Sequence, residues 1–268
     1  MTTKIKKYFV IGNPIDHSLS PKLHNYWIRE NNINALYDKI KLNENDLKNF
    51  IKDIRQQKIT GCNVTVPFKQ AVIPFLDKLS PEALQTQSVN TIIFNDGNLV
   101  GHNTDISGFT KAIQSLGFNL RGKKVLILGA GGVVPSIIFA LNKMGVSKII
   151  VSNRTRQKAE NLKNLFENLK TIEWGNIEYF DMIINATSLG LNNEKINLDF
   201  SNVGKNKLFY DVIYNPAETN FLKNAKKNGN LIENGKLMFV YQALEAFKLW
   251  HEVEPKISNE IFKLLEND

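Results

Sequence analysis

One stretch of the sequence decides the fold: Val125-Leu126-Ile127-Leu128-Gly129-Ala130-Gly131-Gly132-Val133-Val134. Its first four residues are an apolar run typical of a buried strand, and a helical pattern follows from about Ile137 to Lys143. Glycines between a strand and a helix let the backbone approach a pyrophosphate, which the helix N-terminus then stabilises. A glycine turn without a ligand is the simpler alternative, and the strand-loop-helix setting favours a dinucleotide-binding loop over it.

Two residues depart from the usual dinucleotide fingerprint. Val134 stands at the third motif position, where glycine or alanine is usual, and Pro135 follows it. We expect the valine side chain to push the helix slightly away from the sheet. Proline is tolerated in a first helical turn, because its missing N–H is not needed there.

The end of the next expected strand indicates which nucleotide binds. A site for NAD has an acidic side chain there for the ribose 2′-hydroxyl, whereas this chain has Ser152-Asn153-Arg154-Thr155-Arg156-Gln157-Lys158. A guanidinium can pair with a 2′-phosphate and stack on adenine. The segment therefore favours NADP over NAD, although without the glycine loop Arg154 would be interpreted as a solvated surface arginine.

Strands alternate with helices on both sides of this loop. Towards the N-terminus we expect strands at about 6–12, 35–40 and the segment that bears Asn63 and Thr65, helices at about 21–31, 45–57 and 69–79, and short antiparallel strands at 90–94 and 99–101. Towards the C-terminus we expect strands at 149–152, 182–185, 208–212 and 231–233, and helices at about 238–250 and 254–265. The alternation predicts an α/β fold with largely parallel sheets.

The βα pattern restarts at Val125, after a helix expected from about Ser107 to Leu116 and the breaker Gly117. The sequence therefore predicts two domains. We expect residues 1–105 to form a substrate-binding and catalytic α/β domain, residues 106–237 to form a Rossmann-type NADP-binding domain, and residues 238–268 to form C-terminal helices that pack on the first domain.

A lysine follows the third expected strand, in Asn63-Val64-Thr65-Val66-Pro67-Phe68-Lys69. Side chains alternate along a strand, so Asn63, Thr65 and Pro67 should share one face while Val64, Val66 and Phe68 share the other. Proline cannot donate to a sheet ladder, so the chain should leave the sheet just before Lys69. This places an amine at a strand end, where α/β proteins usually carry their chemistry. The alternative from this segment alone is an ordinary surface lysine.

Composition excludes several classes of protein. The 268 residues are 43% hydrophobic and 22% charged, which is the ordinary globular range. No apolar run approaches the roughly 18 residues of a membrane span, and we expect a cytoplasmic protein without a signal peptide. Cys62 is the only cysteine and the four histidines fall in no metal-ligand spacing, so we expect neither a disulfide nor a metal.

The net charge of +8 invites a nucleic-acid interpretation. The lysines, however, are scattered along expected helices and are not gathered with aromatic residues into a known module. We therefore expect no nucleic acid and no membrane as partners. A positive field equally favours anionic small molecules.

Motifs in order along nearly the whole chain resemble the shikimate dehydrogenase family. They are His17-Ser18-Leu19-Ser20-Pro21, Asn63 to Lys69, Val89-Asn90-Thr91, Asn103-Thr104-Asp105, Gly129 to Gly132, Asn153-Arg154-Thr155, Asn185-Ala186-Thr187-Ser188, Asp211-Val212-Ile213-Tyr214 and Gly235 through Gln242. The resemblance implies reversible reduction of 3-dehydroshikimate to shikimate by NADPH, within aromatic amino-acid biosynthesis. It also implies that Lys69 and Asp105 form the catalytic pair, with Lys69 as the acid/base and Asp105 as its partner and a hydroxyl anchor. The residues fit this chemistry, because an alkoxide formed from a ketone needs a nearby proton donor.

The same resemblance implies the binding residues. Those for the substrate are Ser18 and Ser20 at its carboxylate with Tyr214 nearby, and Asn63, Thr65, Asn90 and Gln242 at its ring hydroxyls. Those for NADP are Gly129, Ala130, Gly131, Gly132, Val133, Asn153, Arg154, Thr155, Lys158, Thr187, Val212 and Gly235. Local alternatives compete at three positions: Ser20 as a helix N-cap, Asn90 as a turn residue, and Asp105 as the N-cap of the helix near Ser107.

One departure from the family and two alternative functions stay open at this stage. Leu237 stands where the family usually has a second glycine beside the nicotinamide, a departure that concerns cofactor affinity rather than the reaction type. A broader quinate/shikimate dehydrogenase that uses NAD is one alternative, against which the small Ser20 and the Arg154 region argue. A non-catalytic ligand sensor is the other, against which the lysine and aspartate pair argues. Homodimer and monomer are both open.

Overall fold

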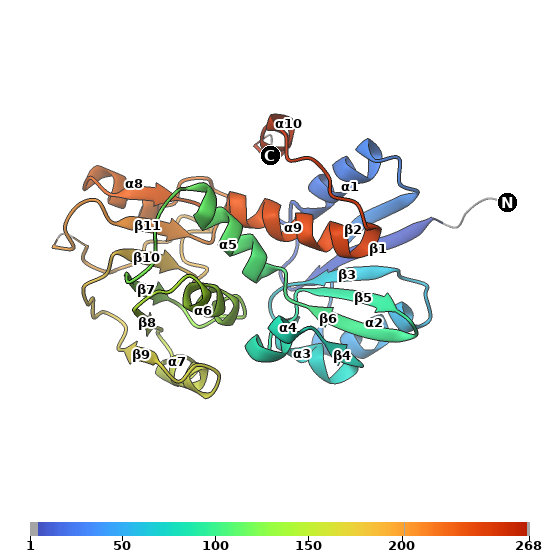
Figure 1. The fold of residues 1–268 in the computed structure, drawn as a ribbon, viewed down its shortest axis with the longest axis horizontal. Helices are drawn as coiled ribbons and strands as arrows, with labels where there is room; N and C mark the ends of the chain where they lie inside the picture. The colour runs from blue at the N-terminus through green and yellow to red at the C-terminus, as the bar shows by residue number, and fades with distance from the viewer. Residues whose placement is uncertain (1–4, 201, 267–268) are drawn as a thin grey trace. The chain divides into compact units, whose positions relative to one another are not determined.

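The computed structural model of the chain describes residues 5–200 and 202–266 (Figure 1). The chain folds into two compact units. The first unit comprises Met1–Asp105 and Val240–Asp268, and the second comprises Ile106–Phe239. The chain passes from one unit to the other within helix α5 (Asp105–Ser115) and again within helix α9 (Lys236–His251).

The first unit contains a six-stranded mixed sheet in the order β2-β1-β3-β5-β6-β4. Its strands are β1 (Lys6–Gly12), β2 (Ala35–Lys41), β3 (Gly61–Val64), β4 (Lys78–Leu79), β5 (Thr91–Asn95) and β6 (Asn98–His102). Strands β1, β2 and β3 are parallel, whereas β5 runs antiparallel to both β3 and β6. The helices are α1 (Ser20–Glu30), η1 (Glu44–Asp46), α2 (Leu47–Arg55), α3 (Phe68–Ala71), η2 (Ile73–Phe75), α4 (Pro81–Thr86) and α10 (Asn259–Leu264), together with the later part of α9.

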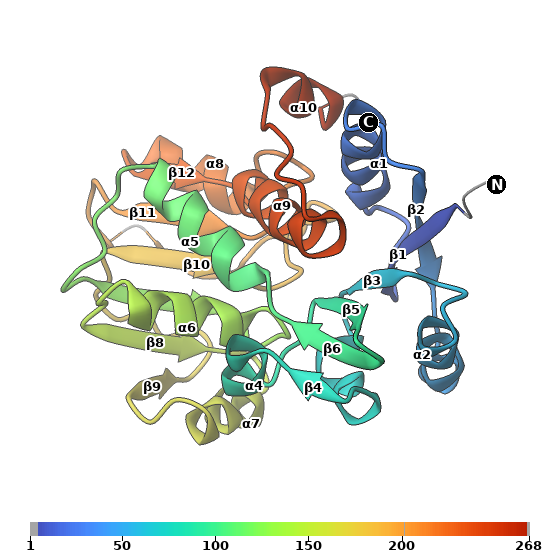
Figure 2. The ribbon, with the colours of Figure 1, turned by 45° about the vertical axis from the view of Figure 1, so that its right-hand side comes forward.

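Helices cover both faces of this sheet, with α1 on one side of β1–β3 and α2 on the other (Figure 2). The sequence explains the arrangement, because α2 buries Leu47, Phe50, Ile51 and Ile54 at helical spacing. These residues pack with Ile11, Cys62 and Val64 in one apolar core. Alternation along β1 sends Tyr8 and Val10 to the opposite face.

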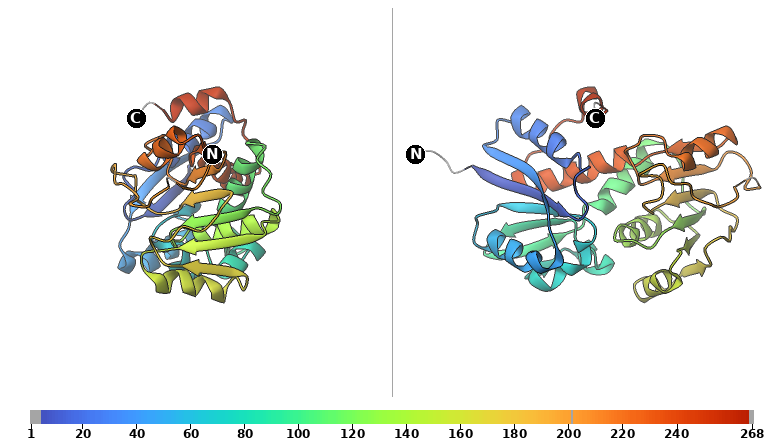
Figure 3. Two further views of the ribbon diagram at one scale, coloured as in Figure 1. Left: turned by 90° about the vertical axis from the view of Figure 1, so that its left-hand side faces the viewer. Right: turned by 180° about the vertical axis from the view of Figure 1, so that it is seen from behind.

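The second unit contains a six-stranded parallel sheet in the order β12-β11-β10-β7-β8-β9 (Figure 3). Its strands are β7 (Lys124–Leu128), β8 (Lys148–Ser152), β9 (Leu169–Ile172), β10 (Met182–Asn185), β11 (Leu208–Asp211) and β12 (Leu231–Glu233). Its helices are α6 (Val134–Lys143), α7 (Arg156–Asn161), η3 (Leu162–Asn164) and α8 (Asn220–Lys227), together with most of α5 and the start of α9. This is the strand order of a Rossmann fold, and it puts the turn after β7 at the point where the strand order reverses. The predicted α/β class with a Rossmann-type unit is confirmed.

Sequence reasoning was wrong in the segment after β3. The strand ends at Val64, and Thr65 already lies in a turn in which the Phe68 N–H donates to its carbonyl oxygen (2.9 Å). The predicted alternation therefore fails, because Phe68 is 1% exposed while Val66 is 53% exposed. Pro74 falls inside the predicted helix over 69–79, and the segment contains only the short helices α3 and η2 followed by β4.

Several smaller expectations also need correction. Strand β9 and the helices α4 and α8 (Asn220–Lys227) were not predicted. Ser20 is not a helix N-cap, because Leu19 occupies that position and Ser20 is the first residue of α1. Asp105 is likewise the first residue of α5 rather than a cap before Ser107. Among the described residues, no helix is long and apolar enough to cross a membrane.

Candidate active site

The first unit holds a buried ion pair between Lys69 and Asp105. The Lys69 Nζ donates a hydrogen bond to Asp105 Oδ2, and the two side chains are only 9% and 7% exposed. Burying two charges is costly unless they are paired and their remaining polar atoms are satisfied. Such a pair therefore needs a supporting set of polar neighbours.

The turn after β3 places Lys69 at this site. Phe68 inserts into the apolar core, and the Val89 N–H donates to the Lys69 carbonyl oxygen (2.9 Å). These two contacts fix α3 between the end of β3 and the chain that enters β5. The lysine side chain is thereby directed to the start of α5, where Asp105 lies.

Asn90 is the centre of the polar network around the carboxylate. Its Nδ2 donates to Asp105 Oδ1 (2.9 Å) and lies 2.8 Å from Thr104 Oγ1 and 3.4 Å from Gln242 Oε1. Its Oδ1 accepts from the Thr104 N–H (2.7 Å) and from Thr91 Oγ1 (3.1 Å). Asn90 therefore joins the ion pair to Gln242 of α9, which belongs to the same unit.

Asn63 is attached to the other side of Asn90. Its Nδ2 donates to the Asn90 carbonyl oxygen (3.1 Å) and to Thr91 Oγ1 (3.0 Å), while its Oδ1 accepts from the Tyr37 hydroxyl (2.6 Å). Asn63 is thus a central member of the network. Sequence reasoning quoted Thr91 and Thr104 in family motifs without giving them a role, and it did not single out Tyr37, whose only signal was an aromatic residue in an expected strand.

The remaining predicted substrate residues lie at the edges of their elements. The Ser20 N–H donates to Ser18 Oγ (3.3 Å), so the two serines meet at the start of α1. Thr65 is half-buried directly after β3, and a Cβ atom on Gly12 would lie 2.5 Å from its Cγ2. Tyr214 belongs to the second unit, where its ring stacks on Phe239 with centroids 4.6 Å apart.

The glycine turn after β7 has one packed position and one open position. Gly129 has φ +111°, its N–H donates to the Ser152 carbonyl oxygen (2.8 Å), and a Cβ there would lie 2.8 Å from the Ala186 carbonyl oxygen. A Cβ on Gly131 would instead have nothing within 4 Å. The turn thus leaves room for a ligand group at Gly131, three residues before the start of the ten-residue helix α6.

Two cationic side chains of the segment after β8 are exposed and could contact an anionic ligand. Arg156 pairs with Glu173 (3.0 Å) and Glu160 (3.6 Å) and is committed to the protein. Arg154 and Lys158 are exposed, and neither has an ion-pair partner among the residues that the structure describes. These two side chains could therefore accompany the dianionic charge of a 2′-phosphate.

A buried carboxylate organises the loops after β10 and β11. Asp211 accepts hydrogen bonds from Asn185 Nδ2 (3.0 Å), Thr219 Oγ1 (2.7 Å) and the Ile213 N–H (3.0 Å), and burial raises its pKa. Asn185 Oδ1 in turn accepts from the N–H and hydroxyl of Thr187 (3.1 and 2.7 Å). The motifs around Asn185 and Asp211 therefore position predicted cofactor residues, a role that sequence reasoning had not given to these two side chains.

Gly235 is required by packing against Val212. A Cβ at this position would lie 2.1 Å from the Val212 carbonyl oxygen, and the Gly235 N–H donates to the Ile213 carbonyl oxygen (3.1 Å). The start of α9 is therefore held close to the loop after β11. Leu237 lies half-buried in the first turn of that helix.

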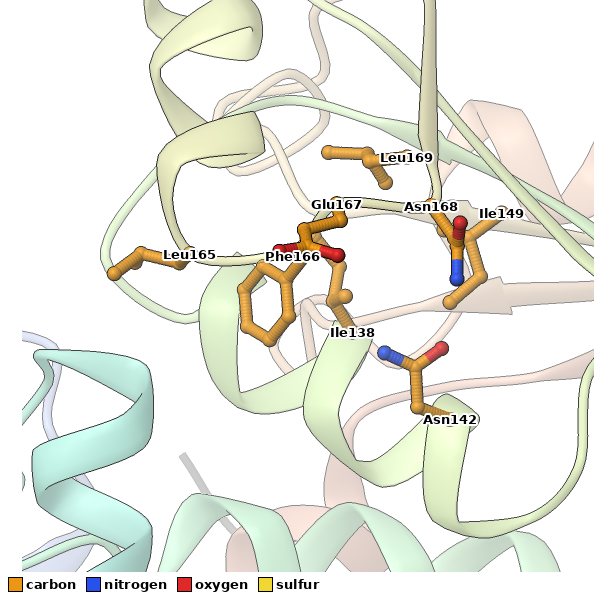
Figure 4. Close-up of a pocket in the computed structure, with 8 residues that line it drawn as sticks. All are labelled: Ile138, Asn142, Ile149, Leu165, Phe166, Glu167, Asn168 and Leu169. Atoms are coloured by element: carbon orange, nitrogen blue, oxygen red, sulfur yellow. The ribbon is translucent and has the colours of Figure 1, made fainter.

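One pocket of the second unit lies away from all these residues (Figure 4). It is lined by Ile138, Asn142, Ile149 and residues 165–169. Ile149 and Leu169 stand at the starts of β8 and β9, the strand ends opposite to those that carry the glycine turn and Asn153. No predicted site residue lines this pocket.

Comparison with known families identifies the chain. Residues 10–92 match the shikimate dehydrogenase substrate binding domain, and residues 110–212 match the shikimate / quinate 5-dehydrogenase family. The chain belongs to the shikimate dehydrogenase family. The family resemblance drawn from the sequence motifs is thereby confirmed.

Individual members of the family are similar over almost the whole chain. A shikimate dehydrogenase (NADP(+)) of Pelagibacter ubique is 55% identical, over 97% of this chain and 99% of the relative. The crystal structure of shikimate dehydrogenase from Aquifex aeolicus has a TM-score of 0.88 at 35% identity and covers both chains fully. The Thermus thermophilus enzyme in complex with NADP(H) and shikimate has a TM-score of 0.87 at 31% identity, over 97% of each chain.

Proposed function

We propose that this chain catalyses the reversible NADPH-dependent reduction of 3-dehydroshikimate to shikimate, with Lys69 and Asp105 as its catalytic pair. The buried ion pair of Lys69 with Asp105 is the observation that carries the assignment of roles. The reaction itself is supported by membership of the family and by the 55% identity to a relative named shikimate dehydrogenase (NADP(+)). We place this reaction in the cytoplasm, as the sequence predicts.

Lys69 moves the proton in this proposal. When bound, NADPH supplies the hydride that reduces the C=O group of the substrate to an alkoxide. The Lys69 ammonium donates its proton to that oxygen, so the product is an alcohol and Lys69 is left as a neutral amine. In the oxidative direction the neutral amine accepts the hydroxyl proton of shikimate, and the same two residues serve both directions.

Asp105 orients the amine and holds its charge. The carboxylate uses Oδ2 for Lys69 and Oδ1 for Asn90, so its two oxygens are separately anchored. A preorganised carboxylate of this kind costs no reorganisation during the proton transfer. Its remaining lone pairs can accept from a substrate hydroxyl.

The substrate is a carboxylic acid with several ring hydroxyls, and the polar residues of the first unit suit it. We assign its hydroxyls to Asn63, Thr65, Asn90 and Gln242, and its carboxylate to Ser18 and Ser20. Amide and hydroxyl groups offer both donors and acceptors, which a polyol requires. The Ser20 to Ser18 hydrogen bond supports the pairing of the two serines.

The second unit supplies the residues that hold NADP. Open space at Gly131 supports a pyrophosphate over residues 129–133 at the start of α6. Arg154 and Lys158, which have no ion-pair partner among the described residues, support a 2′-phosphate beside Asn153 and Thr155. We assign Thr187, Val212 and Gly235 to the nicotinamide half, because their loops are fixed together through Asn185 and Asp211.

The test is an absorbance assay at 340 nm with shikimate and NADP, compared with quinate and NAD. Wild-type enzyme should turn over shikimate with NADP fastest. Lys69→Ala should lower kcat by about 10²- to 10⁴-fold while the KM for shikimate changes little, as expected for an acid/base group. Lys58→Ala is the matched control, because Lys58 forms an exposed ion pair with Asp53 (3.1 Å) and should leave kcat unchanged.

The possible outcomes separate the hypotheses. Faster turnover of quinate with NAD would favour a broader dehydrogenase. No turnover of either acid, with tight binding of shikimate, would favour a ligand sensor. A Lys69→Ala enzyme with the wild-type kcat would overturn the acid/base assignment.

A further inference from the structure

Tyr37 of β2 touches the catalytic network from a side that the proposed reaction does not use. Its side chain is buried, and its hydroxyl donates to Asn63 Oδ1 at 2.6 Å. This is the shortest of the three hydrogen bonds of the Asn63 side chain. Tyr37 is not one of the residues assigned above to substrate, cofactor or proton transfer.

The ring and the backbone of Tyr37 are both held by α1. The His24 ring stacks on the Tyr37 ring with centroids 4.2 Å apart and an interplanar angle of 4°. The Asn25 side chain accepts from the Tyr37 N–H (3.0 Å) and donates to the Tyr37 carbonyl oxygen (2.7 Å). A phenol fixed in this way presents its hydroxyl to one point, which is the amide oxygen of Asn63.

The Asn90 carbonyl oxygen, which can only accept, fixes which way round the Asn63 amide lies. If that amide were flipped, its oxygen would face the Asn90 carbonyl oxygen, and two acceptors would oppose each other. In the observed orientation Nδ2 faces the Asn90 carbonyl and Thr91 Oγ1, and Oδ1 needs a donor. The Tyr37 hydroxyl is that donor.

Each bond then sets the direction of the next one. Thr91 Oγ1 accepts from Asn63, so its own proton is free to go to Asn90 Oδ1 (3.1 Å). Together with the Thr104 N–H (2.7 Å), this donor holds Asn90 with its oxygen towards Thr91 and its Nδ2 towards Asp105 Oδ1 (2.9 Å). Every donor in the chain points towards the carboxylate that holds Lys69.

We infer that Tyr37, held by His24 and Asn25, is a positioning residue that orients Asn63 and Asn90 and, through them, Asp105. The inference rests on the proposed function, because it matters only if these side chains bind and reduce the substrate. It assigns Tyr37 no contact with substrate. Removing its hydroxyl should loosen the substrate-binding amides and leave the second unit unchanged.

Tyr8 provides a matched control for this inference. It is the register partner of Tyr37 on the neighbouring strand β1, and it is equally buried. Its ring packs against Trp250 with centroids 4.9 Å apart. Among the described residues, no hydrogen bond joins its hydroxyl to Asn63. Tyr8→Phe therefore removes a buried phenol oxygen from the same core without removing any hydrogen bond of the series that runs from Tyr37 to Asp105.

The experiment compares Tyr37→Phe with Tyr8→Phe in the wild type and in a Thr91→Val background. Tyr37→Phe should lower kcat/KM for shikimate about tenfold, on the order of one lost buried hydrogen bond, with the KM for NADP within about twofold of wild type. Tyr8→Phe should stay within about twofold for both substrates. Thr91→Val keeps the volume of the side chain but removes the hydroxyl that joins Asn63 to Asn90. In that background Tyr37→Phe should therefore lower kcat/KM for shikimate by less than about twofold.

Two results would overturn the inference. One is a double variant whose fold-loss in kcat/KM equals the product of the losses of Tyr37→Phe and Thr91→Val. Such a result would mean that the two residues act independently. The other is a Tyr37→Phe enzyme that cannot be distinguished from Tyr8→Phe. A wild-type enzyme without shikimate turnover would instead overturn the proposed function, and this inference with it. If Thr91→Val does not fold, Asn63→Ala replaces it in the cycle with the same expectations.

Discussion

Acid should destabilise this protein through His24, and replacing His24 by phenylalanine should remove that effect. The His24 imidazole is 1% exposed and is surrounded by the rings of Tyr37, Trp27, Phe247 and Trp250. Neither ring nitrogen has a hydrogen-bond partner among residues 5–200 and 202–266. Burial, and to a smaller extent the charge of His251, lowers the pKa of His24 to about 3.

The size and sign of the effect follow from this pKa. In the unfolded chain a histidine takes up its proton around pH 6.5, whereas folded His24 stays neutral until about pH 3. Between these values the unfolded state binds more protons, so the free energy of unfolding falls as the pH falls. From pH 7 to pH 5 the loss through His24 is about 2 kcal/mol, at 1.36 kcal/mol for each pH unit below 6.5.

Urea unfolding followed by tryptophan fluorescence measures this loss, because Trp27 and Trp250 lie beside His24. The free energy of unfolding should be determined at pH 7 and pH 5 for wild type and His24→Phe. The wild type should lose about 2 kcal/mol more than the variant over this range. The pKa of His251 is also lowered, to about 4, but this contribution is common to both proteins and cancels in the difference.

A control variant and an opposite outcome make the test decisive. His17→Gln changes an exposed histidine in the loop before α1 and serves as the control for the loss of a histidine outside the buried core. Equal losses in wild type and His24→Phe would show that His24 does not stay neutral in the folded protein. The interpretation of the ring as a neutral stacking surface for Tyr37 would then be wrong.

Four further substitutions test the residues proposed in the two units. Asp105→Asn should lower kcat at least tenfold without a matching rise in the KM for NADP, because the carboxylate is proposed to orient the amine rather than the cofactor. A variant with the kcat of the wild type would contradict this. Arg154→Gln should raise the KM for NADP about tenfold and leave the KM for NAD unchanged, which the 340 nm assay measures, since a charge-assisted hydrogen bond is worth about 1.5–3 kcal/mol. Gly235→Ala should destabilise the second unit by about 1–3 kcal/mol in thermal unfolding, because its Cβ meets the Val212 carbonyl oxygen at 2.1 Å. Gly131→Ala, whose Cβ meets nothing within 4 Å, should keep the melting temperature and weaken NADP binding; the reverse pattern would refute both glycine roles.

The strands of the second unit were predictable because each is a short apolar run between turn signals. Strands β10 and β12 have the predicted bounds, and β7, β8 and β11 differ by one residue at one end. Parallel strands buried on both faces have such runs, so local sequence is enough to locate them. Strand β9 was missed because it lies at the edge of the sheet and has two adjacent polar residues, Lys170 and Thr171, between its apolar ends.

The segment from Lys69 to Leu79 shows the limit of periodicity. Val72, Phe75 and Leu76 have helical spacing, and the sequence pattern therefore predicted one helix. Pro74 removes a backbone donor in its centre, and the chain instead makes η2 and then pairs β4 with β6. An apolar residue such as Leu79 can therefore belong to a short edge strand, although its spacing is helical, when a proline prevents the helix.

The candidate site was predictable where a motif names the residue, and not where tertiary contacts do. The family motifs led to Lys69, Asp105, Asn63 and Asn90, and the structure joins these four by hydrogen bonds. Tyr37 carries no such signal, because an aromatic residue in a half-buried strand is ordinary core. Its importance depends on the stacked ring of His24, which comes from another element and could not be located without the fold.

The buried ion pair also explains why the polar network around it is so extensive. Lys69 and Asp105 are both withdrawn from water, and an isolated pair of this kind is often less stable than an apolar substitute. The amides and hydroxyls of Asn90, Thr104 and Asn63 replace the lost water with fixed dipoles. Dipoles that are already oriented before the reaction stabilise a charge that changes during it, without having to rearrange. The network that compensates for burying the pair is therefore the same one that would prepare it for the proposed proton transfer, and a substitution that loosens it should impair activity more than stability.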